Sequence, residues 1–161
     1  HYETGEPIPD ELVERLEAAA KFNQGFATVE YLASAWVDMQ MHLAGETPID
    51  ADAFERDALE QLGMPDEIVM RHRVPQFGHV FSGDGYSAGY YSYLWSDTLT
   101  ADAAEAFKEA GSMYDTETAK RLRAWVLSVG DTVDPAEGFR QFRGRDVSVD
   151  ALMRDRGFPV E

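Results

Sequence analysis

The chain has 161 residues, 44% of them hydrophobic and 27% charged, which is ordinary for a folded protein with a buried core. Thirty acidic residues against 14 basic ones give a net charge of −16, and such a charge repels nucleic acids and anionic membranes. The absence of cysteine excludes disulfides and thiol catalysis. No apolar run approaches the roughly 18 residues of a membrane span. We therefore expect neither a nucleic-acid nor a membrane partner.

Two helices are predicted near the start, after an extended segment that contains two prolines. Apolar residues recur at helical spacing from Asp10 onward, and residues 23–25 interrupt this first pattern. The second helix is predicted from about residue 26 to 43 and ends before Gly45 and Pro48. Because apolar side chains surround much of its circumference, we expect it to be central and largely buried.

A third helix is predicted at residues 51–62, with Asp50 as its N-cap and Gly63 as the residue that ends it. An irregular segment over residues 66–81 follows, because Pro75 and Gly78 interrupt any regular pattern. It holds the densest basic spot of the chain, Arg-His-Arg at 71–73. This spot is either a solvated loop or the place where an arginine binds a substrate carboxylate.

Four further helices are predicted in the second half, bounded by capping residues and glycines. They end at Gly111, Gly130, Gly144 and Gly157. Nowhere do apolar and polar residues alternate for long enough to form a sheet. The sequence therefore predicts an all-α array of about seven helices, arranged as a single domain over residues 1–161.

The stretch from 77 to 97 holds four of the seven tyrosines. Tyr86, Tyr90 and Tyr93 are spaced i, i+4 and i+7, so a helix would place them on one face, with Tyr91 elsewhere. Phenol donors gathered at one point suit the binding of a carbonyl or an oxyanion. Aromatic residues at helical spacing are also typical of core packing, and the spacing alone leaves both interpretations open.

A short loop with His79 before it precedes these tyrosines. Gly83 and Gly85 flank Asp84 in this loop. Glycine allows a backbone to adopt φ > 0 or to pass close to a ligand. The loop is therefore a candidate part of the same binding site.

Most of the chain resembles the zinc peptidase family that includes peptidyl-dipeptidase Dcp, oligopeptidase A and thimet oligopeptidase. The segments that carry the resemblance are HYETGEPIP, FNQGFATVEYLASAWVDMQMH, RHRVPQFGH, GHVFSGDGYSAGYYSYLWSD and FRQFRGRDVSVDALMRDRGF. The tyrosine-rich segment is long and unusual. Its AGYYSYLW part is most similar to the branch that releases dipeptides.

The resemblance implies the C-terminal portion of a larger helical zincin-type peptidase that hydrolyses short peptides. The family binds zinc through an H-E-x-x-H motif and a further Glu. This chain has histidines only at positions 1, 42, 72 and 79, so it lacks that motif. We therefore expect zinc in the full-length enzyme, no metal ligand in this segment, and no peptidase activity from the segment alone.

The resemblance also implies roles for the tyrosine-rich stretch. It implies two catalytic residues, Tyr93 as donor to the oxyanion and His79 beside the substrate backbone. It implies four substrate-binding residues, which are Tyr86, Tyr90, Gly83 and Gly85.

Two other functions stay open on the sequence alone: a non-catalytic helical module that binds peptides, and a purely structural helical domain. For the peptidase, the expected partners are short peptides and the remainder of the catalytic domain. Self-association of the segment is also expected, because the face that meets that remainder would be exposed. The expected location is cytoplasmic, with export of the parent protein left open.

Overall fold

The structure is a computed structural model that describes residues 1–160. Within these residues it contains seven α-helices and no strand, which confirms the all-α prediction. Contacts between Cα atoms group the chain into two compact units, His1–Tyr93 and Leu94–Glu161. Each unit has its own cluster of buried apolar side chains. The single domain expected over residues 1–161 stays a prediction.

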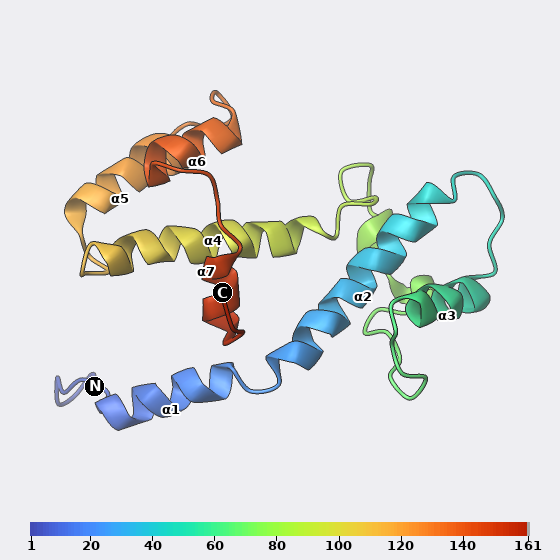
Figure 1. Cartoon of the computed structure of the whole chain (residues 1–161), viewed down its shortest axis with the longest axis horizontal. Coiled ribbons are helices and arrows are strands. Elements are labelled where there is room, and N and C mark those ends of the chain that lie inside the picture. The colour runs from blue at the N-terminus through green and yellow to red at the C-terminus, as the bar shows by residue number, and fades with distance from the viewer. Residues whose placement is uncertain (161) are drawn as a thin grey trace. The chain divides into compact units, whose positions relative to one another are not determined.

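The helices follow the predicted order along the chain (Figure 1). The first unit contains α1 (Asp10–Ala20), α2 (Gln24–Leu43), α3 (Ala51–Gln61) and the 3₁₀ turns η1 (Val74–Gln76) and η2 (Gly78–Phe81). The helix α4 (Ser92–Glu109) begins at the end of this unit and continues into the second. The second unit then contains α5 (Thr116–Leu122), the π-helical turn η3 (Arg123–Leu127), α6 (Pro135–Arg143) and α7 (Asp150–Arg156).

Capping residues account for several of the helix ends. The Asp50 carboxylate accepts a hydrogen bond of 2.8 Å from the Ala53 backbone N–H, as expected of an N-cap. Gly144 and Gly157 end α6 and α7 with φ of 77° and 78°, a region that glycine adopts at no steric cost. The predicted ends at these positions are confirmed.

The core of the first unit lies between α2, α3 and the turns η1 and η2. Its buried apolar residues are Ala33, Val37, Met41, Ala58, Leu59, Met70, Val74, Phe77 and Val80. The expectation that α2 is largely buried is wrong. Four large apolar residues on α2 are 36–44% exposed, namely Phe26, Val29, Leu32 and Trp36, and α1 has no buried residue.

The helix predicted to end at Gly130 is interrupted. Helix α5 ends at Leu122, and the chain continues as the π-helical turn η3. Gly138 of α6 packs against this turn, where an added Cβ would lie 2.6 Å from the Trp125 carbonyl oxygen. Only glycine therefore permits α6 to approach the turn so closely.

A buried carboxylate links α4 to the chain that follows α6. Asp102 is 0% exposed. It accepts hydrogen bonds from Arg143 (2.8 Å), from Arg145 (2.6 and 2.7 Å) and from the Ser148 backbone N–H (2.9 Å). These bonds satisfy a charge that would otherwise be costly to bury.

Candidate functional site

The tyrosine-rich stretch does not form the single helix that its spacing suggested. Helix α4 begins only at Ser92, so Tyr86 and Tyr90 lie in the preceding turns. Three consecutive turns are closed by backbone hydrogen bonds, Tyr86 N–H to Gly83, Gly89 N–H to Tyr86 and Ser92 N–H to Gly89. The prediction of one helical tyrosine face is therefore wrong, and the turns must bring these rings together.

The three tyrosines still converge on His79. The Tyr93 hydroxyl lies 3.0 Å from Nε2 of His79, within hydrogen-bond distance. The ring centroids of Tyr86, Tyr90 and Tyr93 lie 4.8, 5.8 and 5.8 Å from that of His79. The turn η2 positions His79, and residues 86–93 position the three tyrosine rings that face it.

The rings of His79, Tyr90 and Tyr93 border a cavity of about 560 Å³ within the first unit. Its lining residues are Tyr31, His72, Gln76, Phe77, Gly78, His79, Tyr90 and Tyr93. A cavity of this size can hold a small ligand. The sequence had not indicated Tyr31 or Gln76, and it had indicated His72 only as part of the basic spot at 71–73. His72 stacks on Phe77 at a centroid distance of 5.2 Å and meets the Tyr90 ring edge-on at 6.3 Å.

The phenols of the cavity are suited to donate hydrogen bonds. Burial raises the pKa of the Tyr90 hydroxyl; the positive charge of Arg71 lowers it and Tyr93 raises it, with a net upward shift. The Tyr90 hydroxyl is therefore protonated at neutral pH, and a protonated phenol can donate. Tyr93 is 46% exposed, so a ligand can reach its hydroxyl.

Gly83 and Gly85 contribute no special backbone geometry. Neither has a positive φ, and a Cβ added to either would meet no atom within 4 Å. The residue with a left-handed backbone in this stretch is Ala88, at φ 55°. The glycine loop is thus exposed and open, and it places no functional group in the cavity.

The basic spot at 71–73 divides into different environments. Arg73 forms ion pairs with Asp52 at 2.9 Å and with Glu55 at 2.5 Å. Arg71 is 66% exposed at its side chain, and its guanidinium lies 3.9 Å from Glu30. Arg73 therefore serves the packing of α3, whereas Arg71 lies near enough to Tyr90 to influence its pKa.

Two residues of α2 that the sequence reasoning missed hold the tyrosine turns. The Tyr31 hydroxyl donates to the Tyr90 carbonyl, and the two rings stack at 5.3 Å. The Asp38 carboxylate is 1% exposed and accepts from the backbone N–H groups of Ala88 and Tyr90 at 3.1 and 3.0 Å. Their signal was an acid and a phenol seven positions apart, and so on one face of a helix that also carries apolar residues.

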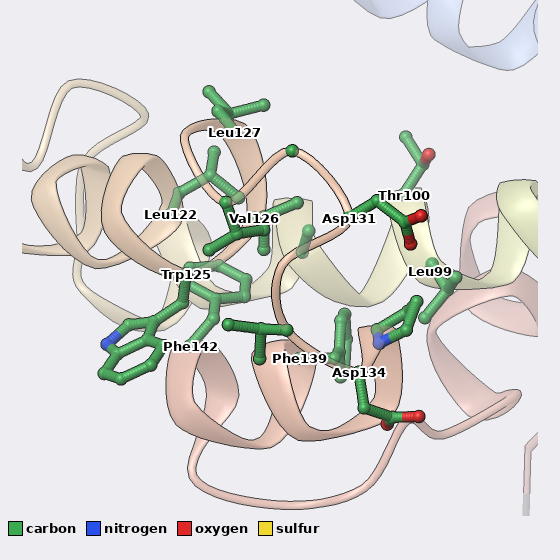
Figure 2. Close-up of a pocket in the computed structure, with 15 residues that line it drawn as sticks. Leu99, Thr100, Leu122, Trp125, Val126, Leu127, Asp131, Asp134, Phe139 and Phe142 are labelled. Carbon is green, nitrogen blue, oxygen red and sulfur yellow. The ribbon is translucent and has the colours of Figure 1, made fainter.

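A second cavity lies in the second unit, with a volume of about 520 Å³ (Figure 2). Its walls are formed mainly by apolar side chains such as Trp125, Val126 and Phe139. Its two carboxylates, Asp131 and Asp134, lie on the side away from Trp125, and Asp134 caps α6. Because this cavity lacks a cluster of hydrogen-bond donors, the tyrosine cavity is the better candidate active site.

The described residues offer no metal centre. Over residues 1–160, no three His, Cys, Asp or Glu side chains are grouped so that they could hold a metal ion. In the same part of the chain, no helix is long and apolar enough to cross a membrane.

Comparison with known proteins finds one family and several relatives. The family described as Peptidase family M3 matches residues 1–158. The chain is 37% identical to dipeptidyl carboxypeptidase of Escherichia coli (strain K12), over 99% of this chain and 24% of that protein. It is 36% identical both to oligopeptidase A of the same strain and to probable cytosolic oligopeptidase A of Arabidopsis thaliana, over 98% of this chain and 23% of each. It thus spans about a quarter of the length of the curated relatives it matches.

Proposed function

The chain belongs to peptidase family M3, and we propose that it supplies the peptide-binding and oxyanion-stabilising groups of an oligopeptidase or dipeptidyl carboxypeptidase. The observation that carries this proposal is the position of the Tyr93 hydroxyl, 3.0 Å from His79 Nε2 at the edge of a tyrosine-lined cavity. The family resemblance of the same residues supports it.

Tyr93 is the proposed donor to the oxyanion that develops on the scissile carbonyl. A hydroxyl can accept one hydrogen bond while it donates another. If His79 carries its proton on Nε2, it donates to the Tyr93 oxygen and leaves the Tyr93 O–H to donate to the substrate. A donor placed where charge develops stabilises the transition state more than the ground state.

The other tyrosines and the loop are proposed to hold the substrate. Tyr86 packs edge-on against His79, and Tyr90 lines the cavity, so both can contact a bound peptide. Gly83 and Gly85 belong to an exposed loop that would close over it. Of the arginines in the basic spot, Arg71 is the better candidate for a substrate carboxylate, because Arg73 is held by two acidic side chains.

Zinc is the cofactor that the family resemblance implies, and its chemistry is to activate a water molecule for attack. Residues 1–160 do not fit it, since no three of their His, Cys, Asp or Glu side chains are grouped so that they could hold a metal ion. We propose that the remainder of the catalytic domain holds the metal and is the main partner of this chain. Short peptides are the proposed substrates, and the cytoplasm is the proposed location.

The direct test compares two proteins, the natural gene product that contains this sequence and the isolated 161-residue chain. We expect the first to cleave a short peptide until a chelator removes its metal. We expect the second to cleave nothing, with or without added zinc, because its described residues, 1–160, hold no group of three side chains that could bind a metal ion. Mass spectrometry of the peptide products measures both. Zinc-dependent cleavage by the pure chain would overturn the proposal that the remainder of the catalytic domain holds the metal. A gene product that binds peptides without cutting them would instead identify a helical binding module.

We also expect the isolated chain to self-associate. The exposed apolar side chains of α2 include Leu32 and Trp36, at 36% and 37% exposure, and apolar patches of this kind are usually covered. Sedimentation analysis should show oligomers, and Trp36→Glu should reduce them. Tyr114→Ser is the control, because Tyr114 is 91% exposed on a loop remote in sequence from α2. A chain that stays monomeric at high concentration would contradict this expectation.

A further inference from the structure

We propose that Asp38 and Tyr31, both on α2, are positioning residues for the tyrosine site. They fix the backbone of residues 88–90, and this backbone in turn places Tyr90 and Tyr93 opposite His79. The catalytic consequence of this inference rests on the proposed function, but the positioning itself does not.

The two residues lie on the same face of α2. They are seven positions apart, so two turns of helix separate them, with about 20° between their directions. Both reach the same short segment from across a large sequence separation, 52 residues for Asp38 to Tyr90 and 59 for Tyr31 to Tyr90. Helix α2 therefore acts as a rigid support along which the turns are aligned.

Asp38 uses its two carboxylate oxygens for two different backbone groups. Oδ1 accepts from Ala88 N–H and Oδ2 accepts from Tyr90 N–H. Ala88 has φ 55°, a conformation that alanine rarely adopts, and the carboxylate stabilises it by accepting from that residue. The His42 Nδ1 atom lies 2.9 Å from Asp38 Oδ1 and also 2.9 Å from the Asp38 backbone carbonyl oxygen.

Tyr31 completes the support on the other side of the same peptide segment. Its hydroxyl donates to the carbonyl oxygen of Tyr90. The same carbonyl accepts the backbone N–H of Tyr93 at 3.4 Å, in the first turn of α4. The position of Tyr90 thus sets the start of α4 and, through it, the direction from which Tyr93 approaches His79.

Asp38→Asn separates this role from simple stabilisation. An amide has one acceptor oxygen, and its NH₂ group would face one of the two N–H groups that the carboxylate now accepts. The variant keeps the shape of the side chain but loses one of the two bonds. Glu55→Gln is the matched control. Glu55 is 4% exposed and also accepts a backbone N–H, from Val74 at 2.8 Å, but it does not bond to residues 88–90.

The kinetic test uses the peptidase that contains this chain, with Asp38→Asn, Tyr93→Phe and the double variant. A small displacement of a catalytic group can cost on the order of 10²-fold in rate, so we expect Asp38→Asn to lower kcat about 10- to 100-fold. Because it acts through Tyr93, the double variant should be little worse than Tyr93→Phe alone. Glu55→Gln should lower the melting temperature, and its effect on kcat should simply multiply with that of Tyr93→Phe. A multiplicative effect of Asp38→Asn would overturn the proposal.

The second test does not depend on peptidase activity. Amide hydrogen exchange in the 161-residue chain should speed up at Ala88 and Tyr90 by at least about 10-fold in Asp38→Asn, because their acceptors are disturbed. The signal of the His79 ring nitrogen should shift as well. In Glu55→Gln, the exchange rates at Ala88 and Tyr90 and the His79 signal should stay as in the wild type. Unchanged exchange at Ala88 and Tyr90 would refute the positioning role. If exchange is altered but Tyr93→Phe leaves kcat unchanged, the proposed oxyanion role is refuted. The positioning role then still holds.

Discussion

Tyr93→Phe should lower kcat of the proposed peptidase that contains this chain by about 10²- to 10³-fold, with little change in KM. The substitution keeps the ring and its packing against Tyr90 and His79 and removes only the hydroxyl. If that hydroxyl donates to the oxyanion, the loss falls on the transition state. By analogy with other oxyanion-hole deletions it should amount to roughly 2.7–4 kcal/mol. Steady-state kinetics on a short peptide measures both constants.

Tyr91→Phe is the internal control for this prediction. Tyr91 is 56% exposed and its ring is not among those that surround His79. The Tyr91→Phe variant should therefore have nearly the same kcat as the wild type. Equal losses in the two variants would mean that the hydroxyl of Tyr93 has no special role. A change in melting temperature alone would mean that the tyrosine cluster is part of the core.

The sequence predicted that three tyrosines gather at one place, and they do gather around His79, but by a partly different route. A helix through residues 86–93 would have placed Tyr86, Tyr90 and Tyr93 on one face, but successive turns occupy most of that stretch. The helix fails there because Asp38 takes the N–H groups of Ala88 and Tyr90, and a helix would need those N–H groups for its own ladder. The rings converge nevertheless, because the turns fold back toward η2 and His79.

Local chemistry was predictable and long-range partners were not. The N-cap at Asp50 bonds to a backbone group three residues away, so a short sequence window contains the whole interaction. Asp38 and its partners are about 50 residues apart, and no local sequence pattern in either segment predicts the contact. Helix α2 carries two acids, Glu30 and Asp38, and only the fold shows that Asp38 is the buried one and which groups it bonds.

Asp102 is a buried acid of the second unit, and Asp102→Ala should cost about 3–5 kcal/mol of unfolding free energy, because removing one partner leaves buried charges uncompensated. Its partner Arg143 is 6% exposed at its side chain and would retain only Glu109. Urea denaturation followed by Trp95 and Trp125 fluorescence, in a Trp36→Phe background, reports on this unit. Glu109→Gln is the control. Glu109 is 58% exposed, so its replacement should cost about 1 kcal/mol or less.

The pH dependence of that loss gives an independent check. Burial by itself would raise the pKa of the Asp102 carboxyl, but hydrogen bonds from Arg145, Ser148 and Arg143 together lower it below its ordinary value. A carboxyl whose pKa is lower in the folded state stabilises the fold fully above its unfolded pKa of about 4 and loses this contribution as the pH falls through the folded pKa. The difference between wild type and Asp102→Ala should therefore be constant near neutral pH and shrink below about pH 4. A difference that stayed constant into acid would show that Asp102 stabilises the unit by packing, and not as a charged acceptor for the two arginines.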